Sequence, residues 1–162
     1  MKVGILSDTH DRAQAMMKGV AALKEAGAEF FIHCGDVGSP GMLDELAGLR
    51  AGFVWGNNDL DRVELQRYAE SLGIICWGDY GVVELAGKRI GVMHGDNFAL
   101  HRKVLAEQQI DYLLEGHTHV RADEKFGTIR MINPGALYRA AQKTVAVLDL
   151  ATGELKFIVV QV

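Results

Sequence analysis

Short apolar runs alternate with stretches of helical periodicity in the first half of the chain. The apolar runs are residues 3–6, 30–32 and 52–55. The stretches with helical spacing are residues 12–26, 40–49 and 61–72. In the first of these, Met16, Val20 and Leu23 fall on one helix face. Strand, polar tip and helix in repetition are typical of βαβ units, so we expect a parallel sheet here.

The residues that separate the predicted strands change in type after residue 73. Further strands are predicted at residues 74–77, 82–85, 89–93, 110–114, 126–132 (around a turn), 144–150 and 155–160. Gly78-Asp79 and Ala86-Gly87-Lys88 are typical of hairpin turns rather than crossover helices. One more helix is predicted over residues 98–108. The second half therefore predicts a mixed or antiparallel sheet.

Length and charge bound the class of protein. A chain of 162 residues has the length of one domain, so we expect a single domain over residues 1–162 that folds without disulfides or a structural metal. The net charge of -4, with no basic run, argues against binding to nucleic-acid polymers. The first apolar run is too short for a signal peptide and no run approaches membrane-spanning length, so we expect a cytoplasmic protein without membrane contact. Any oligomer is expected to be a homodimer that buries an apolar surface.

The segment Gly116-His117-Thr118-His119 is the first candidate for chemistry. It follows an apolar run, and in extended chain the rings of His117 and His119 would point to the same side. Neutral imidazole is the commonest protein ligand for borderline divalent metals. Taken alone, a His-x-His pair is more typical of surface or supporting histidines in a turn, so further evidence is needed.

The other strand ends supply that evidence. Each polar tip after an apolar run carries oxygen or imidazole donors. The candidate metal ligands at these five strand ends are Asp8, His10, Asp36, Asn57, His94, His117 and His119. Because the carboxyl ends of adjacent strands in an α/β sheet line one crevice, we expect these side chains to meet. Seven donors are about the number that two metals sharing a bridging carboxylate require.

The same blocks, in the same order, resemble the calcineurin-like metallophosphoesterase superfamily. The matching blocks are Asp8-x-His10, Gly35-Asp36, Gly56-Asn57-x-Asp59, His94-Gly95 and Gly116-His117-x-His119. The resemblance covers residues 1 to about 135, and Asn133-Pro134-Gly135 is similar to the small, cap-less bacterial and archaeal phosphodiesterase branch. It implies an α/β fold in which a two-sheet β-sandwich is flanked by helices (α/β/β/α).

The resemblance also implies how two divalent metals are held. One would be bound by Asp8, His10, Asp36 and His119. The other would be bound by Asp36, Asn57, His94 and His117, with Asp36 bridging. The mixed nitrogen and oxygen donors suit Mn, which we favour, and also Fe, Ni, Co or Zn, better than Mg or Ca.

The implied activity is hydrolysis of a small phosphate ester by a hydroxide that bridges the metals. The residues expected at the catalytic step are Asn58, Asp59 and His94, and the expected substrate contacts are Asn57, Asn58 and His117. The family has a general-acid histidine where this chain has Asn58, and an asparagine cannot deliver a proton at neutral pH. We therefore expect a phosphodiesterase that favours good leaving groups. Asp59 would position Asn58 or cap the helix near Asp61.

The missing histidine also keeps an alternative open. Some members of this fold, including a retromer subunit, act as protein-interaction scaffolds with little or no catalysis. Against that alternative, all seven presumed ligands are present. Three other candidates receive conservative interpretations: His33 as a packed or supporting histidine, His101 as a solvent or substrate-rim residue, and Arg139 as a surface arginine.

Overall fold

The computed structural model describes all 162 residues, in three α-helices, one 3-10 helix and eleven strands. The helices are α1 (Ala13–Glu25), η1 (Pro40–Leu46), α2 (Arg62–Ser71) and α3 (Phe98–Glu107). The strands are β1 (Lys2–Leu6), β2 (Phe30–His33), β3 (Ala51–Phe53), β4 (Ile75–Cys76), β5 (Tyr80–Leu85), β6 (Lys88–Met93), β7 (Tyr112–Leu114), β8 (Ala122–Phe126), β9 (Ile129–Asn133), β10 (Thr144–Asp149) and β11 (Leu155–Val159).

The strands form two mixed sheets. The first has the order β11-β10-β1-β2-β3-β4, and the second has the order β5-β6-β7-β9-β8. In the first sheet β1 to β4 run parallel, as the strand-helix repetition predicts, while β10 and β11 join antiparallel. In the second sheet β6, β7 and β9 are parallel, and the hairpin strands β5 and β8 are antiparallel to their neighbours. The predicted parallel first part and mixed second part are thus confirmed.

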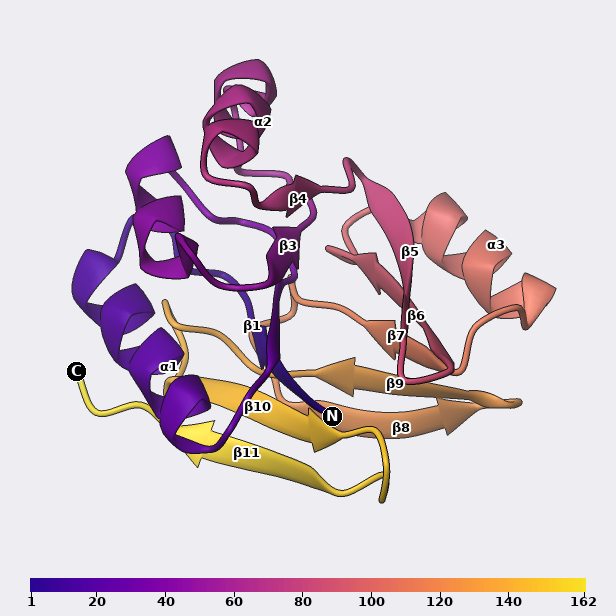
Figure 1. Cartoon of the computed structure of the whole chain (residues 1–162). Helices are drawn as coiled ribbons and strands as arrows, with labels where there is room; N and C mark the ends of the chain where they lie inside the picture. The colour runs from indigo at the N-terminus through magenta and orange to yellow at the C-terminus, as the bar shows by residue number, and fades with distance from the viewer.

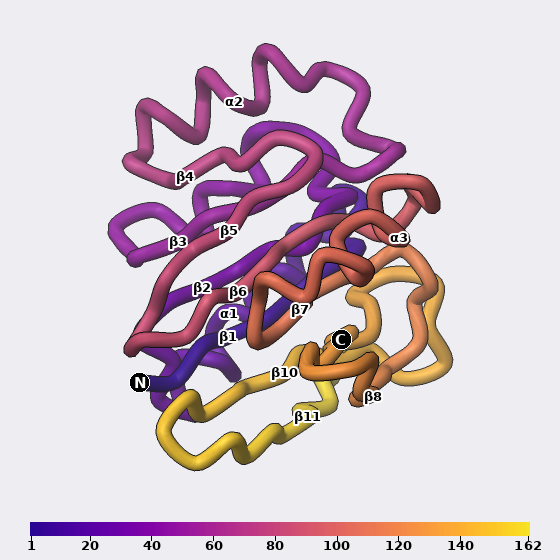
Figure 2. Tube along the Cα trace, turned by 90° about the vertical axis from the view of Figure 1, so that its right-hand side faces the viewer, coloured from indigo at the N-terminus to yellow at the C-terminus, as the bar shows by residue number.

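Three apolar clusters define four layers. The cluster around Ile5, Ile32, Val92 and Leu114 lies between the two sheets. A second cluster joins the first sheet to α1, η1 and α2, and a third joins the second sheet to α3. Figure 1 shows this arrangement, with α1 and α3 on opposite sides of the strands, and Figure 2 shows it from the side. The expected α/β/β/α architecture is confirmed.

The helices begin and end close to where the pattern places them. Asp61 caps α2 by accepting from the backbone N–H of Glu64 at 3.0 Å, and Asn97 caps α3 through the N–H of Leu100 at 3.0 Å. Residues 40–46 form a 3-10 helix, shorter than the helix expected over 40–49. The longest helix has 13 residues, and none of the helices is long and apolar enough to cross a membrane.

One predicted hairpin is wrong. We expected Gly78-Asp79 to join two antiparallel strands, but β4 pairs parallel with β3 in the first sheet, and β5 belongs to the second sheet. The segment between them crosses from one sheet to the other. The ring of Trp77 is packed against Gly52 of β3, and its Cβ and Cγ atoms against Gly81 of β5, so a glycine on each sheet makes room for this crossing residue.

The hairpin at Ala86-Gly87 is present, with both residues at positive φ (49° and 74°) as its turn requires. Around residue 127 the strands extend further than predicted. β8 begins at Ala122, in a stretch of mostly exposed polar residues that carries no apolar signal.

Substitution of Gly52 tests the crossing. A Cβ atom at this position would meet the six-membered ring of Trp77, with Cζ3 at 2.7 Å, and the backbone on either side is fixed in a sheet. We expect Gly52→Ala to lower the free energy of unfolding by about 1–3 kcal/mol, measured by urea denaturation. In the matched control Gly41→Ala, the added Cβ meets nothing within 4 Å, so the change should stay within about 0.5 kcal/mol. Equal effects for both variants would contradict the packing described.

Candidate metal centre

Five strand ends converge on one site. Asp8 and His10 follow β1, Asp36 follows β2, and Asn57 follows β3. His94 follows β6, and both His117 and His119 follow β7. The first three strands belong to one sheet and the last two belong to the other. The carboxyl ends of two stacked sheets, rather than one, therefore supply the candidate ligands.

Ligand atoms from four of these strand ends lie within metal-binding reach of one another. Asp36 Oδ2 lies 3.3 Å from His10 Nε2 and 3.3 Å from His94 Nε2. Asp8 Oδ1 lies 3.2 Å from His119 Nε2 and 3.9 Å from both His10 Nε2 and His94 Nε2. Two sets of three ligand atoms, Asp8 with His10 and His119, and Asp8 with Asp36 and His94, fit within 4.8 Å.

Unpartnered polar atoms test whether this arrangement fits a metal. Asp8 Oδ1, His10 Nε2 and His94 Nε2 are buried and have no well-directed hydrogen bond. Leaving such atoms without partners costs free energy, and in native proteins it is rare. All three face the same space between two carboxylates, which is where a divalent cation would satisfy them. The residues present therefore fit a metal centre.

The backbone is strained at the same residues. Nine non-glycine residues have positive φ, a conformation that costs L-residues free energy. Five of them are candidate ligands: Asp8, His10, Asp36, His117 and His119. The left-handed conformation turns the chain sharply after each strand, so that side chains near the strand end face the common site.

Hydrogen bonds hold the ligand-bearing segments in place. His94 Nδ1 donates to the carbonyl of Cys34 at 2.8 Å, which leaves Nε2 directed at the carboxylates. The backbone N–H of His117 donates to Asp8 Oδ2 at 3.1 Å. The Nδ2 group of Asn133 donates to Gly116 O at 2.7 Å and to Thr118 Oγ1 at 3.1 Å. Asn133 therefore orients the loop that carries His117, a role that the sequence did not reveal.

His33 supports this site from beneath. It is fully buried, its Nδ1 accepts from the N–H of Gly35, and its Nε2 is hydrogen-bonded to Thr9 Oγ1. Burial and the nearby His94 lower the pKa of His33 to about 3, so it stays neutral. The interpretation of His33 as a packed histidine agrees with these contacts.

The buried charges set the electrostatics of the metal-free protein. Burial alone would lower the pKa of His94, but the Asp36 carboxylate 3.3 Å away outweighs it and raises the pKa to about 9. Burial would raise the pKa of Asp36, and the groups of His94 and Asn58 lower it well below its usual range. Burial raises the pKa of Asp8, against the opposing effect of His94. In the metal-free protein, the protonated imidazole of His94 thus supplies positive charge beside the two carboxylates, as a metal cation would.

The residues after β3 have separate positions. Asn57 lines the cavity beside the ligands. Asn58 lines it too, and its backbone N–H and its Nδ2 group donate to Asp36 Oδ1 and Oδ2, each at 2.8 Å. Asp59 is buried, and its two oxygens accept from the N–H groups of Gly38 at 2.9 Å and Gly56 at 2.8 Å. Asp59 therefore neither positions Asn58 nor caps α2, which is capped by Asp61.

The cavity above these ligands has a volume of about 330 Å³. Its wall includes two residues that the sequence did not place there, Tyr138 and Arg139. The ring of Tyr138 lies 5.1 Å from the ring of His10, centre to centre. Both follow Asn133-Pro134-Gly135, and that neighbourhood was the only signal in the sequence. Arg139 is exposed, as expected of a surface arginine, and it also lies on the cavity wall.

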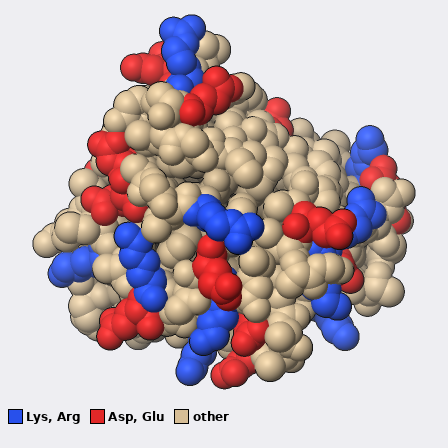
Figure 3. Space-filling view, viewed as in Figure 1, with Lys and Arg blue, Asp and Glu red and all other residues tan.

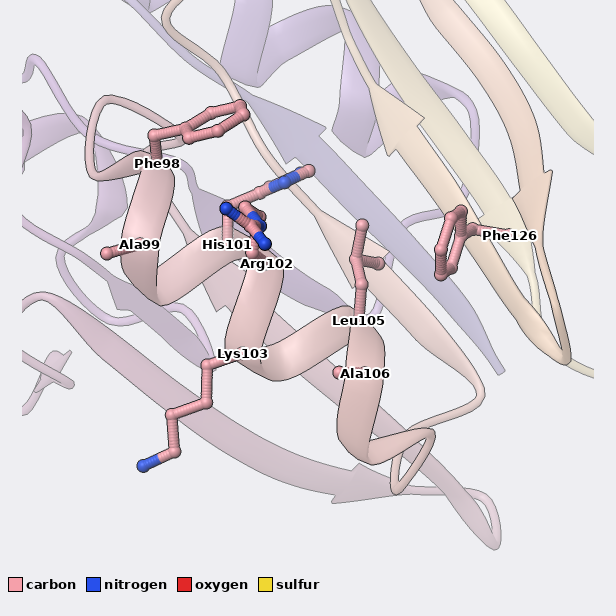
Figure 4. A pocket seen from close by; sticks show the side chains of 8 residues that line it. All are labelled: Phe98, Ala99, His101, Arg102, Lys103, Leu105, Ala106 and Phe126. Atoms are coloured by element: carbon pink, nitrogen blue, oxygen red, sulfur yellow. The ribbon is translucent and has the colours of Figure 1, made fainter.

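A larger cavity of about 820 Å³ lies elsewhere, between α3 and β8. Figure 4 shows Phe98 and Phe126 at its sides, with Leu105 pointing between them and Lys103 pointing away. His101 belongs to its wall and pairs with Glu115 at 2.9 Å, so it is not among the converging ligands. This groove is mostly apolar and brings together no candidate ligands.

The charged side chains on the face seen in Figure 3 are mixed in sign. Lysine and arginine alternate with aspartate and glutamate rather than gathering in one patch. A continuous basic surface that could follow a nucleic-acid backbone is thus missing from this face.

Comparison with known proteins identifies relatives over the full chain. A family model described as the calcineurin-like phosphoesterase superfamily domain matches residues 1–153. A phosphodiesterase of Methanocaldococcus jannaschii is 30% identical over 168 residues, covering 99% of this chain and 100% of the relative. The match extends the resemblance noted in the sequence beyond residue 135.

Solved structures agree with the fold. The structure of an archaeal phosphodiesterase superposes with a TM-score of 0.91 at 29% identity, covering 99% of this chain and 100% of that one. Vps29 of Entamoeba histolytica, solved in complex with zinc, superposes with a TM-score of 0.67 at 18% identity, covering 99% and 98%. At this low identity, the second similarity concerns the fold alone.

The His94–Asp36 pair predicts how stability depends on pH without metal. The folded-state pKa of His94, about 9, lies above its reference value of 6.5, so the pair stabilises the fold fully below about pH 6.5 and loses this effect as the pH rises through about 9. We expect the melting temperature of the metal-free protein to fall across this range, and the fall to be absent in His94→Asn. His101→Asn, which leaves the pair intact, should follow the wild type. Parallel curves for wild type and His94→Asn would contradict the pairing.

Proposed function

The chain belongs to the calcineurin-like phosphoesterase superfamily, and we propose that it is a binuclear, metal-dependent phosphodiesterase acting on small phosphate diesters. The protein is a metal-dependent phosphoric ester hydrolase, as its family is hydrolytic and its full-length relative is a phosphodiesterase. The observation that carries the proposal is the set of buried, unpartnered ligand atoms between Asp8 and Asp36.

We assign the ligands of the two metals as the family resemblance suggests. Asp8, His10, Asp36 and His119 hold one ion. Asp36, Asn57, His94 and His117 hold the other, with Asp36 between them. Two distances support the bridging role, since Asp36 Oδ2 lies 3.3 Å from both His10 and His94, ligands of different ions. Asp8 Oδ1 also lies 3.9 Å from Nε2 of His94, which would hold the second ion. The mixed donor set favours Mn, with Fe, Ni, Co and Zn as alternatives.

Charge then selects the substrate. Two divalent cations against the carboxylates of Asp8 and Asp36 leave about two positive charges in the cavity, which attract an anion such as a phosphate ester. When bound, the metals supply Lewis-acid stabilisation of phosphate oxygens and lower the pKa of water to about 7, making it a nucleophile. Asn57 and His117 line the same cavity, so the ester is bound against them.

The leaving group receives no proton from the residue at position 58. The Nδ2 group of Asn58 is hydrogen-bonded to the carboxylate of Asp36 and, being an amide, has no acidic proton to give. Loss of a general acid typically costs about 10²- to 10⁴-fold in rate, most for poor leaving groups. Asn58 and His94 act on the metal-bridging carboxylate, while Asp59 fixes the loops after β2 and β3. Diesters with acidic leaving groups are therefore the best substrates.

The second candidate function is a protein-interaction scaffold with little catalysis. The asparagine at position 58 and the similarity in fold to Vps29 favour it. The unpartnered ligand atoms argue against it, because a scaffold has no need of a buried site that costs charge repulsion and backbone strain.

We further propose that the chain forms a single domain, that the protein is cytoplasmic, and that any oligomer is a homodimer.

The activity is tested with two aryl esters. We expect the metal-free protein to hydrolyse neither, and the protein with Mn²⁺ to cleave bis-p-nitrophenyl phosphate faster than p-nitrophenyl phosphate. His117→Ala should lose at least about 10²-fold in kcat/KM, because it removes a ligand and a cavity wall. His101→Ala, outside the cavity, should match the wild type. If Mn²⁺ binds and neither ester is cleaved, the result contradicts the phosphodiesterase proposal and favours the protein-interaction scaffold.

Asn58→His tests the missing general acid. The family carries its general-acid histidine at this position, so the new imidazole should be able to donate a proton to the leaving group. The rate on p-nitrophenyl phosphate should then rise relative to the diester, by about 10-fold or more. Asn58→Ala serves as the matched control, since it removes the bond to Asp36 without adding an acid. An identical ratio of monoester to diester activity in both variants would show that position 58 does not govern leaving-group preference.

A further inference from the structure

A second cavity adjoins the metal cavity. It has a volume of about 590 Å³, within the range of small-molecule sites, and lies at the start of α1. Tyr138 and Arg139 line both cavities, so they form the partition between them. A substrate in one cavity can therefore extend past this partition into the other.

Most of the charged side chains that line the second cavity are basic. Arg12, Arg139 and Lys143 belong to its wall. Asp11 is the acidic residue there, and its Oδ1 already accepts from the N–H of Ser39 at 2.6 Å. Three positive side chains stand against the carboxylate of Asp11 and the terminal carboxylate of Val162, which also lines the cavity, so a net positive charge remains that attracts anions.

The partition residue is held by the basic groups. The Arg12 guanidinium carbon lies 4.5 Å from the centre of the Tyr138 ring, and that of Arg139 lies 5.2 Å from it. Both guanidinium groups lower the pKa of the Tyr138 phenol. The ring also lies beside that of His10, tilted by 50° at 5.1 Å between ring centres, so the basic residues are one side chain away from a candidate metal ligand.

The start of α1 adds to the same field. Its N-cap residue, Arg12, makes no side-chain capping bond, and the backbone N–H groups of Ala13 and Gln14 donate to no protein acceptor. Both residues line the cavity. Free N–H groups at a helix start favour an anion, and they supplement the three basic side chains.

Resting on the proposed phosphodiesterase activity, we infer that this cavity binds a second phosphate group of the substrate, one that is not cleaved. Arg12, Lys143 and Arg139 contact it, and Tyr138 separates it from the scissile phosphate. The substrate class is thereby narrowed to diesters that carry a further phosphate, such as a nucleoside diester with a terminal phosphate on its sugar. These residues would bind the second phosphate and take no part in the cleavage step itself.

Two chromogenic substrates isolate the second phosphate. Thymidine 5′-(p-nitrophenyl phosphate) and the same compound with a 3′-phosphate share the scissile bond and the leaving group. With Mn²⁺, the wild type should prefer the 3′-phosphorylated compound by about 10-fold or more in kcat/KM, because charge-assisted hydrogen bonds stabilise the added group. The preference should weaken at high salt, since the cavity is open to solvent.

Charge-removing variants locate the effect. In Arg12→Gln and Lys143→Gln the ratio of the two kcat/KM values should fall toward one. Lys24→Gln removes the same charge from the far end of α1, where Lys24 is exposed, and should keep the wild-type ratio. An unchanged ratio in both cavity variants would overturn the assignment to this cavity.

Binding without metal gives a readout apart from catalysis. By calorimetry, the metal-free protein should bind thymidine 3′,5′-bisphosphate more tightly than thymidine 5′-monophosphate, and Lys143→Gln should remove the difference. If neither chromogenic ester is hydrolysed but this difference is found, the proposed activity fails and the anion site stands. If both esters are hydrolysed equally and the two nucleotides bind equally, the inference fails and the activity stands.

Discussion

The repulsion between two buried carboxylates, Asp8 and Asp36, is the constraint on which the rest of the site depends. Both lie in the interior with almost no solvent exposure, and imidazoles and the amide of Asn58 lie against them. Without a cation, the protein offsets their charge by holding a proton on His94. With divalent metals in place, the same carboxylates would serve as ligands, and the strained backbone at Asp8, Asp36 and His119 presents these side chains to the shared site.

Much of this could be predicted from the sequence. The polar tips after the apolar runs identified all the converging side chains, because a strand end fixes where the following residue lies. The sequence did not show how the strands are distributed between the two sheets. The carboxyl ends that meet at the site come from two stacked sheets. β4 pairs in the first sheet, where the ring of Trp77 packs against Gly52, and a local sequence pattern does not reveal such a contact between distant residues. Tyr138 reaches the cavity from a loop whose sequence has no periodic pattern. The carboxylate oxygens of Asp59 accept hydrogen bonds from backbone N–H groups of two neighbouring loops, which the sequence did not indicate.

The position of Asn58 connects the fold to the choice of substrate. Its backbone and side-chain N–H groups both donate to Asp36, so the residue orients the Asp36 carboxylate and, as an amide, offers no acidic proton for a leaving group. Catalysis then depends on the metals and on a leaving group that departs unaided. Recognition has to come from elsewhere, and the basic cavity beyond Tyr138 offers a means of selecting a substrate by a charge away from the bond that breaks.

The most direct test of the central claim is the number and position of the metals. Crystals grown with Mn²⁺ and measured at a wavelength where manganese scatters anomalously should give two peaks per chain. One peak should lie among Asp8, His10 and His119, and the other beside His94 and His117, with Asp36 between them. A single peak, or peaks away from Asp36, would contradict a binuclear centre built on these strand ends.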